Sequence, residues 1–348
     1  MAEFKNTFSW SKSRDGTFKS CKRKYFYNYY ASWGGWDAAS DRRTRQIYIL
    51  KNLQTRQIWL GSCVHEFIES ILTRTRSGYE ADLYRMLGNI KSVMQEDFEN
   101  SKKGLYAKYP KIHGRTYGLL EHEYDILITT DELKDILENA GNCITNFYNS
   151  DTFNYIRSVE RKNWKQIESL RTFDFEGTDV YVVIDFAMSG GKKDLSEIKP
   201  ELRNLTLAEY DSKTGYGNIK NKSEYDSYSD ENLIIFDWKT GRVRFEEKET
   251  MNVQLACYSL YSQKKWSVSP ENIICKKYNV MIDKVDDYEI NDAVIDKVKD
   301  YMRESINDMK ELLCDKENNV AREEDFSVTD DDNVCRWCNF RKICSKWE

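Results

Sequence analysis

The sequence predicts an α/β protein in which β-strands form a core that is flanked by helices. Two observations support this class. Apolar, β-branched runs are concentrated between residues 165 and 285, and long segments on both sides carry the spacing of amphipathic helices. Because sheets and helices bury their apolar faces against each other, this arrangement predicts an α/β core with a helical elaboration. The 348 residues suffice for one large domain, and we expect residues 1–348 to form one.

The first half of the chain is predicted to be mainly helical. A first helix is expected over 17–31, around CKRKYFYNYY, and a second over 56–76, where apolar residues recur every three or four positions on one face. Residues 80–165 continue this pattern as a helical elaboration. A Gly/Pro-marked loop near Pro110 interrupts them.

The second half is predicted to hold the strands. We expect strands over 167–175, 179–187, 232–239 and 272–283, and helices over 248–264 and 290–315. The segment 189–231 is polar, rich in Gly, Ser, Asn and Lys, and has little periodicity. We interpret it as an insertion between two strands.

Composition argues against a membrane or secreted protein. The chain is 40% hydrophobic and 32% charged, and no segment approaches the roughly 18 apolar residues of a membrane helix. The first residues, MAEFKNTFSWSKSRDG, have no apolar run that would serve as a signal sequence. We therefore expect a cytoplasmic protein, in which nine cysteines are thiols or metal ligands rather than a disulfide framework.

Charge is unevenly distributed along the chain. The net charge of -5 argues against indiscriminate coating of nucleic acid, yet residues 1–45 contain an excess of Lys and Arg interleaved with Phe, Tyr and Trp. Such a mixture suits a phosphate backbone with stacked bases. An amphipathic helix with aromatics in the core and lysines in water explains it equally well, so both interpretations stay open.

The stretch LIIFDWKTG, residues 233–241, places an acid and a lysine at the end of an apolar strand. Side chains alternate along a strand, so Asp237 and Lys239 are expected on the same face. They form either a simple salt bridge or a metal-binding carboxylate beside a lysine that handles a charged reacting group.

Three other segments of the chain carry acidic or polar side chains beside apolar residues. Asp185 ends a second apolar strand, VVIDF, and His65 and Glu69 lie one helical turn apart. In QLACY, Gln254 and Tyr258 are also one turn apart. Taken singly, a lone histidine is more often structural than a ligand, and a Gln or Tyr commonly satisfies backbone groups.

Together these positions resemble the RecB-type branch of the PD-(D/E)XK nuclease superfamily. Gly61, His65 and Glu69 fit GxxxHxxxE, Asp237-Trp238-Lys239 fits (D/E)xK after the Asp185 strand, and QLACY fits QxxxY. The resemblance implies a restriction-endonuclease-like fold with a mixed sheet core.

The resemblance also implies roles for individual residues. The metal ligands for Mn²⁺ or Mg²⁺ would be His65, Asp185, Asp237 and the backbone carbonyl of Trp238. Lys239 would polarise the attacking water or steady the phosphate. Gln254 and Tyr258 would contact the substrate, Glu69 would support the metal ligands, and Glu168 is a weaker candidate for that support.

The C-terminal segment reads Cys335-Arg-Trp-Cys338, with a third cysteine at Cys344. Three thiolates lack one ligand for a four-coordinate site, and Cys21 is the candidate for the fourth. Spacing alone leaves zinc as a rival. The chain resembles the iron–sulfur RecB-like nucleases, including CRISPR-associated exonucleases and AddB-type subunits, which implies a 4Fe–4S cluster that ties residues 1–31 to 330–348.

The expected function is that of a metal-dependent deoxyribonuclease, either an exonuclease or an enzyme directed at single strands of DNA. No GxxxxGK[ST] motif is present, so ATP-driven unwinding would need a helicase or another partner. The alternative is a nuclease-fold DNA-binding subunit of a repair or defence complex that is inactive without its partner. Three departures from the family pattern are the 189–231 insertion, Phe186 after Asp185 and the length of the 80–165 segment. They bear on the substrate path and on regulation rather than on the catalytic groups.

Overall fold

The computed structural model describes residues 5–108, 117–190, 231–241 and 252–347. Its centre is a six-stranded mixed sheet. The strands are β1 (Ser9–Trp10), β4 (Trp164–Phe175), β5 (Thr178–Ser189), β6 (Leu233–Lys239), β7 (Ile273–Asn279) and β8 (Lys284–Glu289). Strand β5 is antiparallel to β4 and β6 and parallel to β1, while β6 is parallel to β7 and β7 antiparallel to β8. The predicted α/β class with a mixed sheet is confirmed.

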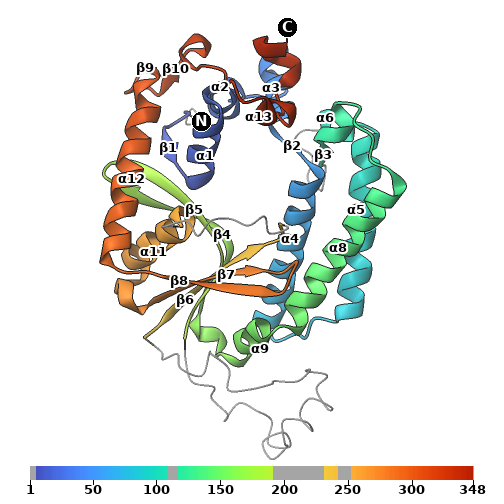
Figure 1. Ribbon diagram of the computed structural model, residues 1–348, viewed down its shortest axis with the longest axis vertical. Helices are drawn as coiled ribbons and strands as arrows, with labels where there is room; N and C mark the ends of the chain where they lie inside the picture. Colours follow the sequence, from blue (N-terminus) through green and yellow to red (C-terminus); the bar gives the residue numbers. More distant parts are fainter. Residues whose placement is uncertain (1–4, 109–116, 191–230, 242–251, 348) are drawn as a thin grey trace, which may run out of the picture.

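Helices cover both faces of this sheet (Figure 1). The long helices on one side are α4 (Arg56–Arg76), α5 (Leu83–Lys102), α8 (Thr130–Asn149) and α9 (Asp151–Ser158), and those on the other are α11 (Val253–Trp266) and α12 (Asp292–Glu311). Strand β6 contributes to both layers by alternation. Leu233 and Ile235 pack in the core beside α11 and α12, whereas Ile234 and Phe236 pack in the core beside α4 and α8.

Shorter elements complete the described chain. They are α1 (Lys12–Ser20), α2 (Lys22–Phe26), a π-helix (Tyr27–Ala31), α3 (Arg42–Lys51), β2 (Leu53–Gln54), α6 (Leu105–Lys108), β3 (Gly118–Leu119), α7 (Leu120–Glu123), β9 (Leu313–Asp315), β10 (Val320–Ala321) and α13 (Asp332–Arg336), with 3₁₀ turns at Arg161–Asn163, Pro270–Asn272, Glu323–Asp325, Arg341–Ile343 and Ser345–Trp347. In the described part of the chain, no helix has both the length and the apolar character needed to cross a bilayer.

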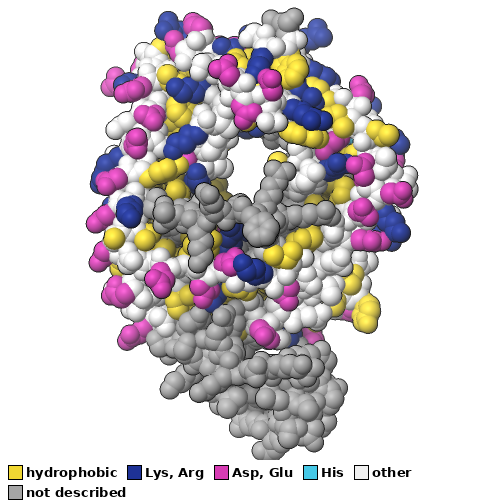
Figure 2. Space-filling view, in the orientation of Figure 1, with side chains coloured by type: hydrophobic (Ala, Val, Ile, Leu, Met, Phe, Trp, Pro, Cys, Tyr) yellow, Lys and Arg dark blue, Asp and Glu magenta, His cyan; other side chains and the backbone are white. Residues whose placement is uncertain are grey.

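The two ends of the chain pack against each other at the top of Figure 1. Arg23 donates from its backbone N–H to the carbonyl of Ser327, and its guanidinium pairs with Glu323 at 3.1 Å. The Tyr27 hydroxyl donates to the same Glu323 carboxylate at 2.7 Å. Contacts of this kind close the molecule into a ring of elements, and Figure 2 shows an opening through it. In Figure 1 this opening lies between α1 and α4, above the sheet.

Three predicted elements differ in part from the structure. The helix over 290–315 ends at Glu311, and Leu313–Asp315 form strand β9 instead. The single helix over 17–31 is broken at Cys21, whose backbone is extended (φ -164°, ψ 114°) and separates α1 from α2. The strand over 272–283 ends at Asn279, because the chain turns before β8 and Asp283 adopts a positive φ of 52°. The helix over 56–76 coincides with α4. The predicted loop near Pro110 and nearly all of the 189–231 insertion lie outside the described residues.

Candidate active site and cysteine cluster

Three side chains from three elements converge on one point. His65 of α4 places its Nδ1 atom 2.9 Å from Glu168 Oε1 of β4 and 3.7 Å from Asp185 Oδ1 of β5. One ligand atom from each of these residues lies within 4.8 Å of the other two. His65 and Glu168 are partly accessible and Asp185 is buried. This is a spacing at which one small cation would contact all three.

The β4–β5 hairpin is irregular where it carries the two acids. Ser169 pairs with Ile184 and Ile167 pairs with Phe186, so Glu168 lies opposite Asp185. Glu168 has a positive φ of 32°, which a non-glycine residue rarely adopts. Along β5, Ile184 packs in the α11–α12 core and Phe186 in the α4–α8 core, so the regular alternation breaks at Asp185. Backbone strain of this kind is concentrated at functional sites, and here it brings an acid from each strand to His65.

Strand β6 brings the predicted acid and lysine beside this cluster. The pairing of β5 with β6 stops at Phe186 and Phe236, so Asp185 and Asp237 lie where the two strands separate. The backbone N–H of Trp238 donates to Asp185 Oδ2 at 2.6 Å. In a strand the N–H and C=O of one residue point to the same edge, so the Trp238 carbonyl also faces β5, as its predicted role requires.

Asp237 and Lys239 share a face, as the alternation predicted. Lys239 Nζ lies 2.7 Å from Asp237 Oδ2 and donates to Gln254 Oε1 of α11 at 3.2 Å. Gln254 Nε2 in turn donates to the Tyr258 hydroxyl at 2.6 Å. The QxxxY pair thus holds the lysine, whose side chain keeps 35% of its surface exposed.

The donor set fits a hard divalent cation. The buried Asp237 carboxylate forms an ion pair with Lys239 Nζ at 2.7 Å. A carboxylate has about four acceptor sites on its two oxygens, so this ion pair leaves room for coordination to a cation. Carboxylate oxygens with one imidazole suit Mn²⁺ or Mg²⁺.

Burial and the neighbouring acids shift the pKa values of the groups in this cluster. Burial alone would lower the pKa of His65, but its hydrogen bond to Glu168 and the nearby charge of Asp185 raise it to about 9. Burial raises the pKa of Asp185 well above its usual range, against the pull of His65. Burial also raises the pKa of Glu69, with a contribution from Glu168. A cation would therefore have to displace the proton on His65.

The glycine of the predicted motif permits a close approach of α4 to the end of β6. A Cβ atom built on Gly61 would lie 3.0 Å from Thr240 Oγ1. Thr240 follows Lys239 directly, so a side chain at 61 would require the Thr240 side chain or the helix that carries His65 to shift by a few tenths of an ångström.

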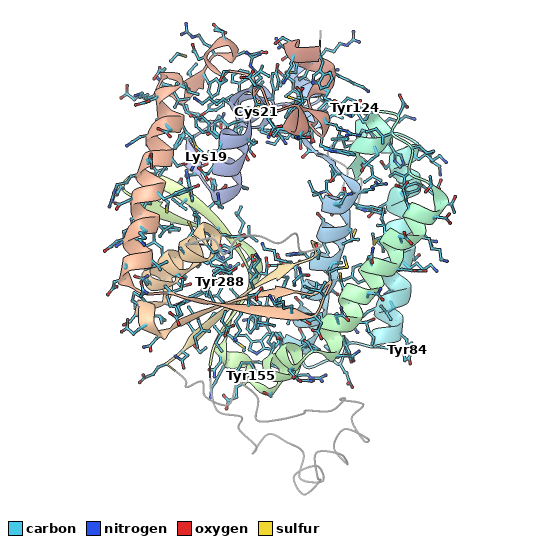
Figure 3. The ribbon with its side chains drawn as sticks, viewed as in Figure 1. Lys19, Cys21, Tyr84, Tyr124, Tyr155 and Tyr288 are labelled. Carbon is cyan, nitrogen blue, oxygen red and sulfur yellow. The ribbon has the colours of Figure 1, made fainter. Side chains whose placement is uncertain are left out.

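All four predicted cysteine ligands line one small cavity. Cys21 reaches it from the break between α1 and α2, and Cys335, Cys338 and Cys344 reach it from the C-terminal segment. The four thiols are free, and the Cys21 sulfur accepts a hydrogen bond from the Lys24 N–H. Figure 3 labels Cys21 at the end of α1, beside the C-terminal segment.

Among the residues that the structure describes, no three of these four sulfurs lie within 4.8 Å of one another.

Comparison with known proteins finds one similarity, to a family model that covers part of this chain. Residues 196–345 match the model of the PD-(D/E)XK nuclease superfamily. This segment contains Asp237, Lys239 and three of the four cysteines. No curated protein matches the chain.

Sequence reasoning underrated one residue. Glu168 was ranked as a weaker candidate because nothing local marks it, yet it makes the shortest contact to His65 in the cluster. Glu168 lies opposite Asp185 because of the register of the hairpin. In the sequence, this pairing is indicated by the equal distances of the two acids from the turn that joins the two strands.

Proposed function

We propose that the protein is a metal-dependent deoxyribonuclease that hydrolyses phosphodiester bonds in single strands or from DNA ends, with a structural 4Fe–4S cluster. One observation carries the proposal. The cation-sized cluster of His65, Glu168 and Asp185 lies beside the ion pair of Asp237 and Lys239. The match to the nuclease superfamily over 196–345 supports the same reading.

The ligands would be His65, Asp185, Asp237 and the Trp238 carbonyl, and the geometry adds Glu168 to the predicted set. A bound Mn²⁺ or Mg²⁺ would supply Lewis acidity and lower the pKa of a bound water. Lys239, held by Gln254, presents a positive charge to the negative phosphate and to the attacking water.

The remaining predicted residues act through these groups. Tyr258 fixes the amide of Gln254, and burial raises the pKa of its hydroxyl well above the usual range, so it stays a neutral hydrogen-bond partner. Glu69 lies one turn after His65 on α4 and adds negative charge near Glu168. Both residues position the catalytic groups.

Preference for a single strand or an end is supported by the shape of the molecule. The opening in Figure 2 is bordered by α4, which carries His65, and by α1. A strand that entered such an opening by its end would pass between these two helices.

The proposed 4Fe–4S cluster would be held by Cys21, Cys335, Cys338 and Cys344. All four cysteines line one cavity between the two ends of the chain, which supports a shared group there and a structural role for it. Thiolates are the ligands such clusters take.

The test is a cleavage assay with anaerobically purified protein. It compares linear and circular DNA, single- and double-stranded, with Mn²⁺, Mg²⁺ or EDTA. We expect cleavage with metal and none with EDTA, and faster cleavage of linear single strands. Equal cleavage of circular duplex would contradict the predicted preference. No cleavage of any substrate would favour a subunit that needs a helicase or another partner.

A further inference from the structure

Two cations face one tyrosine ring. The Arg14 guanidinium of α1 lies 4.3 Å from the centre of the Tyr29 ring, and Lys51 Nζ, at the end of α3, lies 5.5 Å from the same ring. Arg14 also lies 5.8 Å from the ring of Tyr181 on β5. Tyr29 belongs to the π-helix, a rare conformation that is frequent at functional sites. We call these four residues the Arg14–Lys51 cluster.

Among the described residues, no carboxylate oxygen lies within 4.0 Å of Arg14 or Lys51. Lys12 and Lys19, which share helix α1 with Arg14, both pair with Asp15. Figure 3 shows Lys19 on the side of α1 that faces α12. Burial, and then the charge of Arg14, lower the pKa of Lys51 to about 8. Two half-buried cations that repel each other are stabilised by an anion, and none of the described side chains supplies it.

An exposed face of the β4–β5 hairpin connects this cluster with the candidate active site. Leu170 pairs with Val183, and Thr172 pairs with Tyr181, so the four side chains share one face. Leu170 is 62% exposed and Val183 is 40% exposed. The opposite face of the same hairpin, which includes Val182, packs in the α11–α12 core.

This face begins and ends at charged groups. Leu170 and Val183 each lie two residues from an acid of the cluster, Glu168 or Asp185, and Tyr181 lies beneath Arg14. Asp185 follows Tyr181 by four positions along β5, a distance of about 13 Å at roughly 3.3 Å per residue. Exposed apolar side chains next to a tyrosine suit the rings of unpaired bases, and the two cations suit a phosphate.

We propose that the exposed β4–β5 face is the track of a single DNA strand, with the Arg14–Lys51 cluster holding a phosphate about 13 Å from Asp185, a few nucleotides from the reacting one. The inference rests on the proposed nuclease function and extends it by naming a second contact with the substrate. Tyr29 and Tyr181 would orient the guanidinium and offer stacking surfaces.

The experiment uses the full chain and the double variant Arg14→Gln/Lys51→Gln. Fluorescein-labelled dT20 is titrated by anisotropy in Ca²⁺ at several salt concentrations, and cleavage of dT20 and of the dinucleotide dT2 is measured in Mn²⁺. We expect the Kd for dT20 to rise about tenfold or more and the salt slope to fall by about 0.7, the value for one single-strand phosphate contact. Cleavage of dT2, which is too short to reach the cluster, should stay within about twofold.

Controls separate charge at this place from charge in general and from misfolding. Lys91→Gln/Lys134→Gln removes two exposed lysines from α5 and α8 and should change the Kd less than about twofold. Arg14→Lys/Lys51→Arg keeps both charges and should retain binding.

Three results would overturn or redirect the inference. Unchanged Kd and salt slope in the double variant would overturn it. An equal loss of dT2 and dT20 cleavage would overturn it as well, since the cluster would then support the active site itself. If the wild type cleaves neither substrate, the nuclease proposal fails, and the anisotropy arm still decides whether the track binds a strand.

Discussion

Replacing Lys51 with Met should stabilise the protein at neutral pH. Burial and the neighbouring Arg14 lower the pKa of Lys51 from 10.5 to about 8, so its charged form is penalised in the folded state. The penalty is complete below the folded pKa and disappears as the pH rises from about 8 toward 10.5. A difference of 2.5 pKa units corresponds to at most about 3.4 kcal/mol at 1.36 kcal/mol per unit.

Two effects reduce this maximum. Lys51 is only half-buried, and its contact with the Tyr29 ring stabilises the charged form by about 0.5–1 kcal/mol. We therefore expect Lys51→Met to raise the free energy of unfolding by about 2 kcal/mol at pH 7 and by about 1 kcal/mol at pH 9.5.

The assay is thermal unfolding of wild type and Lys51→Met at both pH values, followed by fluorescence, with the exposed Lys91→Met as a control. For a chain of this length the gain at pH 7 corresponds to a Tm increase of about 3 °C. A lower Tm in Lys51→Met than in wild type at pH 7 would show that the buried charge of Lys51 does not destabilise the fold. A Tm difference that is as large at pH 9.5 as at pH 7 would show the same. Lys51 would then be a structural residue.

Three further predictions concern the site and the cysteines. Gly61→Ala should reduce cleavage about tenfold by displacing α4, whereas Gly88→Ala on α5, where a Cβ meets no atom within 4 Å, should leave cleavage unchanged in the same assay. Cys338→Ser should abolish iron–sulfur absorbance and lower the Tm, while the exposed Cys314→Ser should do neither. Because the pKa of His65 is about 9, Mn²⁺ must displace its proton at lower pH, so calorimetry should show an affinity that rises up to about tenfold per pH unit between 6.5 and 8.5.

Strand alternation predicted part of the site directly. Because Asp237 and Lys239 are two residues apart on an apolar strand, their common face followed from the sequence, and the 2.7 Å ion pair agrees with it. Periodicity also predicted the helix that carries His65, because its apolar residues recur every three or four positions.

Long-range register was beyond sequence reasoning. The contact of Glu168 with His65 depends on the pairing of β4 with β5 and on the positive φ of Glu168, and no local pattern specifies either. The broken helix at Cys21 is similar. Its sequence suits a continuous helix, and the extended backbone there agrees with the cavity that its sulfur shares with the C-terminal cysteines.

The N-terminal excess of basic and aromatic residues divides between the two interpretations that the sequence left open. Phe18, Tyr25 and Tyr27 are buried in the core, as the amphipathic-helix interpretation predicted. Arg14 and Tyr29 remain half-buried beside Lys51, an arrangement that agrees with the nucleic-acid interpretation. Composition alone could not separate them, because the assignment depends on which side of each helix faces the ring.

The assignment of the active site is tested most directly by measuring how fast wild type, Lys239→Ala and the control Lys91→Ala cleave a 5′-labelled dT20 strand in Mn²⁺. Manganese binding is measured on the same samples. We predict that Lys239→Ala loses at least about a hundredfold in rate, the scale of removing one group that stabilises the transition state, and still binds Mn²⁺. Cleavage by Lys239→Ala at the wild-type rate would contradict the assignment of the active site.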